Sequence, residues 1–260
     1  MARLVVAGGN GFIGSEICRV ATQNGHDVAA FGRTGRPALT PARHPWTQDV
    51  EWRAADVFAP ETWSDLLEGA DALVHSIATI QEVPEHNVTF ERVNGESVLH
   101  AAQAAVDAGV DGFVFLSVRD TPPFVSDRFV AAKRRAEREL TEQYEALRTT
   151  ILRPNLVFGA RRRGSATMAG VLQQMPGVAS PYASRAGRPL PVELVAAAAV
   201  HAAVTPTLEG TLSVPKIEDL GRTSGLVDPD ALSAPTLTPL LAGLGGAALA
   251  GWLARRWWTR

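Results

Sequence analysis

Short apolar runs alternate with longer amphipathic stretches along the first two thirds of the chain. Six runs have the length and apolar content of buried strands; they cover residues 4–7, 28–31, 50–53, 72–76, 113–117 and 150–152. Four stretches have apolar residues at helical spacing; they cover residues 11–24, 62–68, 90–108 and 126–146. Strands that alternate with helices in this way join as parallel neighbours through right-handed crossovers. The pattern predicts an α/β fold, a Rossmann doubly wound parallel sheet.

The pattern weakens after residue 158. Residues 159–191 are rich in Arg, Gly, Ser and Pro, and they predict a small substrate-side lobe or mobile loops. An Ala-rich helix is expected at 192–204 and a last strand at 212–214. The expected organisation is a domain at 1–217 that includes the small lobe, a linker at 218–235, and a candidate membrane helix at 236–254.

Composition narrows the classes of protein that fit. The 260 residues carry a formal net charge of −2, and no stretch mixes Lys and Arg with aromatic residues as a nucleic-acid surface requires, so nucleic acid is not an expected partner. The single cysteine, Cys18, excludes an internal disulfide and is expected to be a buried structural thiol in a reducing, cytoplasmic compartment. Asp and Glu residues are scattered, and no metal site is predicted.

A glycine-rich turn follows the first predicted strand. Gly8, Gly11 and Gly14 have the spacing of a dinucleotide-binding turn, and Phe12 and Ile13 begin the helix that follows. Glycines permit the tight turn and let the backbone approach a pyrophosphate, which then meets the N-terminus of the helix. The turn predicts a nucleotide site. The alternative is a purely structural glycine turn.

The end of the second predicted strand indicates which nucleotide binds. An acidic residue there would bind the ribose 2′-hydroxyl of NAD(H), but the segment supplies Arg33 and Arg36 instead. Guanidinium groups suit a 2′-phosphate, so NADP(H) is the expected cofactor and NAD(H) the less favoured one. Ordinary surface arginines are the alternative interpretation.

Four further segments, with the glycine turn, carry a resemblance to a known family. They are Ala55-Asp56-Val57, Val74-His75-Ser76-Ile77-Ala78, Val93-Asn94-Gly95 and Leu152-Arg153-Pro154-Asn155-Leu156-Val157-Phe158-Gly159. From residue 1 to about 215 the chain resembles the extended and atypical short-chain dehydrogenases/reductases, which include the NAD-dependent epimerases/dehydratases. The opening segment and Gly32-Arg33-Thr34-Gly35-Arg36 look most like the NADPH-carrying accessory subunit of respiratory complex I and the dehydrogenase-like proteins linked to coenzyme Q synthesis.

The resemblance implies further cofactor contacts. Asp56 and Val57 would lie at the adenine, while Ser76, Ile77 and Ala78 would lie beside the nicotinamide half. Asn94 would be a structural asparagine. Pro154 and Asn155 would lie near the nicotinamide.

The resemblance also exposes a departure at the reaction centre. The family pairs a Tyr with a Lys four residues later, and this chain has Phe129 and Lys133 at those positions. Phe cannot transfer a proton, so Lys133 is expected only as a ribose ligand. Ser117 ends the fifth predicted strand as a candidate catalytic hydroxyl, although the family's Ser or Thr usually lies slightly further on.

Other groups could substitute for the missing proton donor, and none is favoured by spacing. The candidates are His75, Asp120, Thr121 and Tyr144; a satisfied strand histidine and a structural aromatic are the preferred interpretations of His75 and Tyr144. Residues 161–163 are three consecutive arginines that would suit a phosphate-bearing substrate, with a solvated loop as the alternative.

The C-terminal segment differs from the rest of the chain. No charged residue occurs between Ala231 and Ala254, and about 19 residues after Pro235 approach the length needed to cross a bilayer. Trp252, Trp257 and Trp258 lie beside Arg255 and Arg256, as at a membrane interface. The segment predicts attachment to the inner face of a membrane or to a membrane protein. A helix packed on the domain is the alternative.

Two functions are compatible with these features. One is an NADP(H)-dependent oxidoreductase or epimerase-like enzyme acting on a small, quinone- or isoprenoid-related substrate. The other is a non-catalytic accessory, assembly or sensor protein that holds NADPH at a membrane. A homodimer through the helix bearing Lys133 and a monomer are both compatible with the sequence.

Overall fold

The apolar runs form a single parallel sheet in the computed structural model, which describes residues 1–121, 125–161 and 187–233. Its seven strands lie in the order β3-β2-β1-β4-β5-β6-β9. They are β1 Arg3–Ala7, β2 Asp27–Gly32, β3 Val50–Ala54, β4 Ala72–His75, β5 Gly112–Leu116, β6 Arg148–Leu152 and β9 Gly210–Leu212. The chain reverses direction across the sheet between β1 and β4, and this switch point is where doubly wound folds bind ligands. The predicted fold class is confirmed.

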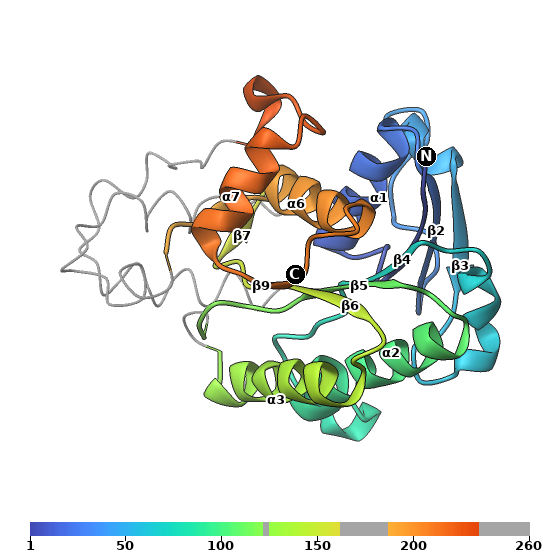
Figure 1. Ribbon diagram of the computed structural model, residues 1–260, viewed down its shortest axis with the longest axis vertical. Coiled ribbons are helices and arrows are strands. Elements are labelled where there is room, and N and C mark those ends of the chain that lie inside the picture. Colours follow the sequence, from blue (N-terminus) through green and yellow to red (C-terminus); the bar gives the residue numbers. More distant parts are fainter. Residues whose placement is uncertain (122–124, 162–186, 234–260) are drawn as a thin grey trace.

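Helices cover both faces of the sheet (Figure 1). One face carries α1 Phe12–Gln23, α6 Val192–Val204 and α7 Val214–Thr223, and the other carries α2 Ser97–Asp107 and α3 Asp127–Gln143. Successive strand residues point to opposite faces, so Leu4 and Val6 pack toward α1 and α6 while Val5 and Ala7 pack toward α2 and α3. Two apolar cores therefore hold the carboxyl ends of the strands at one edge.

The segment expected to be a helix at 62–68 is different in the structure. It consists of two short 3₁₀ turns, Pro60–Thr62 and Ser64–Leu67, on either side of Trp63. The Trp63 ring is fully buried and stacks on Phe31 with the ring centroids 4.3 Å apart. The backbone at Trp63 is not helical, because this conformation lets the large ring be buried. The spacing of apolar residues does not predict this break.

The C-terminal part of the described chain also corrects two expectations. The last strand ends at Leu212, and residues 218–223, expected to begin a linker, form the second half of α7. Pro215 lies in the first turn of α7, where proline is favoured, and Ile217 and Leu220 are buried against α6. A Cβ on Gly221 would lie 2.5 Å from the Leu194 carbonyl oxygen, so α7 and α6 are in close contact.

Two predicted segments fall wholly or largely outside the described residues. The small lobe is described only at its two ends, where β7 Val157–Phe158 pairs with β8 Leu190–Pro191. The candidate membrane helix at 236–254 lies outside the described residues altogether. Of the helices within the described ranges, none has both the length and the apolar content needed to span a bilayer.

Candidate functional site

The glycine turn connects β1 to α1 at the carboxyl edge of the sheet. The amide groups of Gly8 and Gly9 donate to the Phe31 carbonyl oxygen, and Gly8 has a φ of +81°, a conformation that favours glycine. A Cβ on Gly14 would lie 2.6 Å from Ser76 Oγ, so this glycine lets α1 approach β4 closely. The N-cap residue of α1 is Gly11, which has no side chain to cap the helix. The first turn of α1 is thus a ready-made anion site.

The segment after β4 packs directly on this turn. Ser76 Oγ donates to the Ala7 carbonyl oxygen at 2.9 Å, and Ile77 lies against Gly8. Ala78 is exposed beyond them. Asn94, in the π-helical turn Arg92–Glu96, clamps the same segment because its amide accepts from the Thr79 amide and donates to the Thr79 carbonyl oxygen, both at 2.9 Å.

The two arginines after β2 differ in their contacts. The exposed Arg33 side chain has no hydrogen bond or ion pair within the described ranges, whereas Arg36 donates to the carbonyl oxygen and hydroxyl of Thr47. Arg36 therefore holds the loop before β3, and Arg33 is the guanidinium available at the end of β2. Asp56 and Val57 follow β3 at the same edge; Asp56 accepts from the Phe58 amide at 3.1 Å, and Val57 is buried.

Lys133 lies on α3 and points under the carboxyl end of β5. Its side chain is only 2% exposed, and Nζ donates to the Leu116 carbonyl oxygen at 2.8 Å. Nζ also lies 4.9 Å from the centre of the Phe115 ring. Burial lowers the pKa of Lys133 to about 7, and the nearby Glu137 carboxylate opposes this shift. The amine can therefore gain or lose a proton near neutral pH.

Phe129 occupies the position one helical turn before Lys133. It is buried in a small apolar cluster with Phe90, Val118 and Ala132, and its ring meets that of Phe90 edge to face at 6.0 Å. The edge of the site where the resemblance places a phenol is apolar. No proton can be exchanged from this position.

Ser117 is held at the end of β5 by α3. Its hydroxyl oxygen accepts from Arg134 Nη1 at 3.3 Å, and its own amide donates to the Leu152 carbonyl oxygen. The segment after β6 lies beside the segment after β5, because the Pro154 carbonyl oxygen accepts from the Arg119 amide at 2.7 Å. Asn155 is buried and donates to the Gly187 carbonyl oxygen.

The substitute proton donors suggested by the sequence lie in different settings. Tyr144 follows the last turn of α3, eleven residues beyond Lys133, and its hydroxyl donates to the Leu99 carbonyl oxygen, so it is a structural aromatic. The Thr121 hydroxyl donates to Asp127 at 2.8 Å. Asp120 accepts from the Thr121 amide. Asp120, Thr121 and Asp127 therefore bond to one another beside the N-terminus of α3.

His75 is fully buried on the α2 side of β4. The Ser97 hydroxyl donates to the Val93 carbonyl oxygen, so His75 Nε2 must donate to Ser97 Oγ, 3.1 Å away. This fixes the neutral tautomer with an unprotonated Nδ1, which has no hydrogen-bond partner. Burial, together with the Lys133 charge, lowers the pKa of His75 to about 3.

We expect His75 to make the fold sensitive to acid. The pKa of His75 is lower in the folded than in the unfolded chain, so the unfolded chain binds more protons between about pH 3 and 6.5 and stability falls on acidification through that window. From pH 7 to pH 5 the loss is about 2 kcal/mol. Urea unfolding at both pH values should show a smaller loss in His75→Leu than in the wild type. Equal losses in the two proteins, or a smaller loss in the exposed His86→Gln control, would refute the assignment.

The arginine run after β7 is described only at its first residue. Arg161 Nη2 donates to the Phe12 carbonyl oxygen at 2.9 Å and also contacts Ser15 Oγ, so it lies against the first turn of α1. Arg162 and Arg163 lie outside the described residues. Within the described ranges, no three His, Cys, Asp or Glu side chains lie close enough to bind a metal together, and burial raises the pKa of Cys18.

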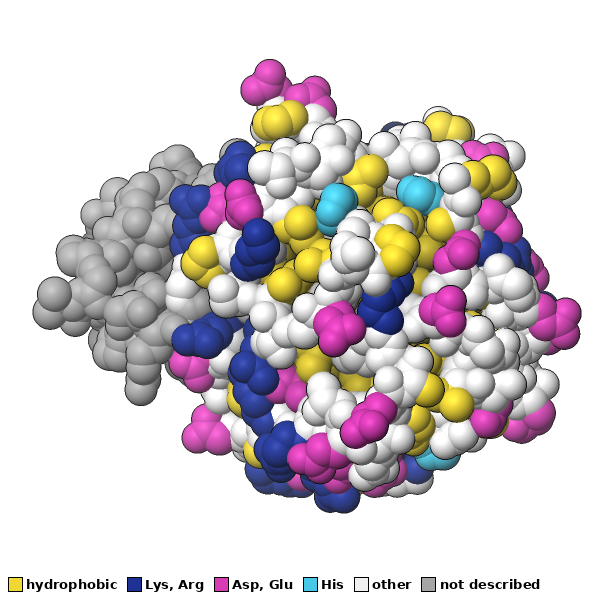
Figure 2. All heavy atoms as spheres, in the orientation of Figure 1, with side chains coloured by type: hydrophobic (Ala, Val, Ile, Leu, Met, Phe, Trp, Pro, Cys, Tyr) yellow, Lys and Arg dark blue, Asp and Glu magenta, His cyan; other side chains and the backbone are white. Residues whose placement is uncertain are grey.

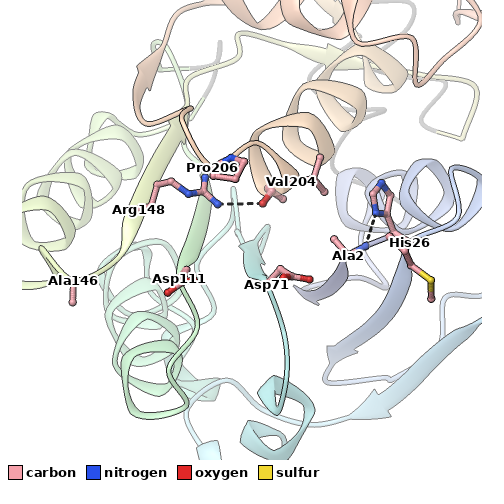
Figure 3. Close-up of a pocket in the computed structure, with 10 residues that line it drawn as sticks. Ala2, His26, Asp71, Asp111, Ala146, Arg148, Val204 and Pro206 are labelled. Carbon is pink, nitrogen blue, oxygen red and sulfur yellow. Dashed lines mark hydrogen bonds between the residues drawn. The ribbon is translucent and has the colours of Figure 1, made fainter.

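A separate cavity of about 720 Å³ opens at the amino edge of the sheet (Figure 3), whereas the glycine turn lies at the carboxyl edge. Two of the charged side chains that line it already have partners in the fold. The Arg148 side chain passes over Gly112 and donates to the carbonyl oxygens of Ala202 and Ala203 at the C-terminal end of α6. The Asp71 carboxylate accepts from the Arg3 amide. This cavity is part of the scaffold.

Sequence reasoning missed one buried ion network beside Ser117. It consists of Arg134 and Glu137 on α3 and Arg153 after β6. The three-residue spacing of Arg134 and Glu137, which places both on one helix face, was a signal for that pair but not for Arg153.

Comparison with known proteins identifies similar sequences and folds. The profile of the NAD dependent epimerase/dehydratase family matches residues 4–179. An uncharacterized chloroplastic protein of Arabidopsis thaliana is 39% identical over 163 residues, which cover 62% of this chain and 52% of the plant protein. MIOREX complex component 2 of Saccharomyces cerevisiae is 26% identical over 205 residues, which cover 62% of this chain and 74% of the yeast protein.

A solved structure shares the fold. It is a putative NAD-dependent epimerase/dehydratase from Bacillus halodurans, with a TM-score of 0.60 and 18% identity over 85% of this chain and 99% of that chain. At this identity the likeness concerns the fold alone. The chain spans about half the length of the Arabidopsis relative.

Proposed function

The chain belongs to the NAD-dependent epimerase/dehydratase family, and we propose that it is an NADP(H)-dependent oxidoreductase acting on a small substrate. One observation carries the proposal. A buried lysine, Lys133, lies beneath the carboxyl end of β5 with a pKa of about 7, beside the switch point of the sheet. Buried groups that titrate near neutral pH are concentrated at functional sites.

The residues of the carboxyl edge fit a dinucleotide. Gly8 and Gly14 lie where a Cβ would collide with the segment after β4 or with the turn itself. The helix α1 begins at this turn, and no side chain caps its N-terminus. The pyrophosphate would lie on this turn, and Arg33 would meet a 2′-phosphate. Ser76, Ile77 and Pro154 would line the nicotinamide half. When bound, the nicotinamide supplies hydride transfer.

Lys133 would perform two tasks in this site. It would donate a hydrogen bond to the ribose, and its ammonium group would supply the proton that the missing phenol cannot. Because the proposed donor must be protonated, the rate of substrate reduction should fall as pH rises through about 7. Burial sets this titration first, and the Glu137 carboxylate, which raises the pKa of Lys133, and the Arg134 guanidinium, which lowers it, set the rest. Quinone- and isoprenoid-related compounds are the first substrates to test.

We propose a second function on the strength of Phe129. A protein that only holds NADPH, as an accessory, assembly or sensor component, needs the nucleotide site but no phenol. A ligand at a hundred times its dissociation constant stabilises a fold by about 2.7 kcal/mol, which is reason enough to retain a cofactor. The resemblance to a component of a yeast complex is in keeping with this function.

Stopped-flow measurements separate the two functions. Bound NADPH is mixed with quinones and carbonyl compounds, and its oxidation is followed by absorbance. Turnover above the rate of free NADPH supports the oxidoreductase. Tight NADPH binding without turnover supports the holding protein, and in that case Phe129→Tyr should leave function unchanged.

Cofactor preference provides a further prediction. We expect NADPH to bind more tightly than NADH, and Arg33→Ala to weaken NADPH binding about tenfold without changing NADH binding, because one charged hydrogen bond to the 2′-phosphate is lost. Fluorescence titration measures both constants. Arg43→Ala, an exposed arginine in the following loop, is the control. Equal binding of the two nucleotides, or a preference for NADH, contradicts the assignment.

We also propose a location and an assembly state from the sequence. The candidate helix at 236–254 would hold this cytoplasmic protein at the inner face of a membrane or on a membrane protein, and α3 would be the contact in a homodimer. Extraction of the full-length chain by detergent but not by high salt would support attachment. Recovery in the soluble fraction without either treatment would refute it, and light scattering would distinguish a dimer from a monomer.

A further inference from the structure

Two guanidinium groups pair with one buried carboxylate where α3 meets the ends of β5 and β6, and a third guanidinium group lies near them. Glu137 is 3% exposed and accepts from Arg134 at 2.7 Å and from Arg153 at 2.6 and 3.0 Å. Arg134 also donates to the Val118 and Arg119 carbonyl oxygens at 2.7 and 2.8 Å. We call Arg119, Arg134, Arg153 and Glu137 the arginine cluster.

Arg119 provides the third positive charge of this cluster. Its backbone is fixed between the ends of β5 and β6 by the hydrogen bonds to Pro154 and Arg134. Its exposed side chain forms no ion pair or hydrogen bond with any described residue. Burial and the charges of Arg153 and Arg119 lower the pKa of Arg134, against the effect of Glu137. One carboxylate therefore faces three positive charges.

No other side chain of the protein supplies the missing negative charge. All 27 Asp and Glu residues fall within the described ranges, because residues 122–124, 162–186 and 234–260 contain none. Asp120, in the loop after β5, and Asp127, the first residue of α3, accept from Thr121 and form no ion pair with the three arginines. Figure 2 shows further Lys and Arg side chains along the side of the molecule that carries α3 and α7.

We infer that the arginine cluster binds an oxyanion, a carboxylate or phosphate group carried by the substrate of the proposed oxidoreductase. Arginine presents a planar fork of donors that matches both groups. The fork of the Arg119 side chain is the one left for a ligand, because the Nη groups of Arg134 and two donors of Arg153 are already used within the fold. The cluster lies beside Ser117, whose hydroxyl oxygen accepts from Arg134 and whose hydrogen is left to donate to a ligand. Ser117 follows the end of β5, and the Lys133 amine on α3 donates to Leu116 at that same end, so an anion here would place the rest of a small substrate toward the nicotinamide half. This inference rests on the proposed function.

The test measures anion binding directly. Protein saturated with NADP⁺, so that the nucleotide's own phosphate sites are filled, is titrated with inorganic phosphate in one experiment and with acetate in another, by calorimetry. Arg119→Gln should weaken binding about tenfold, as expected for one charge-assisted hydrogen bond. Arg135→Gln is the matched control. Arg135 is next to Arg134 on α3, but its side chain lies on the exposed side of the helix and pairs with Glu139 instead of with the cluster. Tighter binding of phosphate than of acetate assigns a phosphate ligand, and the reverse assigns a carboxylate.

Two failures can be distinguished. If NADP⁺ binds but neither anion does, or if Arg119→Gln and Arg135→Gln bind anions like the wild type, the cluster is not an anion site and the proposed function stands without it. If NADP⁺ itself does not bind, the proposed function fails. If Arg119→Gln and Arg135→Gln lose the same amount of anion affinity, the inference is overturned, because the loss would then reflect the overall surface charge.

Discussion

Replacing Lys133 with Met should lower the rate of NADPH oxidation at least about a hundredfold, the usual contribution of a positioned proton donor. Met has nearly the same length and fits the apolar surroundings of Phe115 and Phe129, so the turn from Gly8 to Gly14 should be undisturbed. The lost contact to the ribose should raise the dissociation constant of NADPH by a smaller factor. Stopped-flow oxidation and fluorescence titration measure the two effects separately.

The same substitution should alter how stability depends on pH. The pKa of Lys133 is about 7 in the folded chain and near 10.5 when unfolded, so the unfolded chain binds more protons between these values. The free energy of unfolding of the wild type should therefore contain a contribution that rises with pH across this window, and Lys133→Met should lack it. Below pH 7 the variant should be the more stable protein, because it buries no charge.

Lys216 provides the matched control because it is the only other lysine in the chain. It lies on the surface of α7 beside Asp219, 3.3 Å away. Lys216→Met should change neither the oxidation rate nor the pH dependence of unfolding. If Lys133→Met oxidises NADPH at the wild-type rate, Lys133 is not the proton donor and the chemistry must use another group.

Much of the fold could be predicted from local pattern. Buried parallel strands are continuous apolar runs, so all seven strands of the sheet were located to within two residues, and residues 192–204 form α6 as expected. The prediction failed where a distant partner decides the backbone. Trp63 interrupts the expected helix because it stacks on Phe31 from another element, and α7 is stabilised by contact with α6 rather than by its own polar composition.

The candidate site also has a part that could be predicted from the sequence and a part that could not. The turn from Gly8 to Gly14 and the positions of Phe129 and Lys133 follow from spacing along the chain, and the resemblance to short-chain dehydrogenases/reductases is confirmed at the level of the family. The closer resemblance to the complex I subunit and the coenzyme Q proteins stays a prediction, as does the choice of NADP(H). The pairing of Glu137 with Arg153 could not be predicted, because it joins a helix to a strand end that is sixteen residues away.

This network explains how α3 keeps its register over the sheet. Phe129, Lys133 and Glu137 follow one another at four-residue intervals on one helix face, and each has a different type of contact: an aromatic ring, a backbone carbonyl oxygen and two guanidinium groups. Only the last of these crosses to the end of β6. A change at Glu137 should therefore affect the whole face, including the position of Lys133 Nζ under β5.

Replacing Glu137 with Gln should destabilise the fold by about 3 kcal/mol. The substitution keeps the shape of the side chain but removes the single negative charge, so that Arg134 and Arg153 are left partly buried without a counter-charge. Urea unfolding measures the change. Glu139→Gln, in the exposed pair with Arg135 on the same helix, should show no change beyond experimental error. Added phosphate should restore more stability to Glu137→Gln than to the wild type if the arginine cluster binds anions. Equal stabilities of the two variants would show that Glu137 does not hold α3 to the sheet.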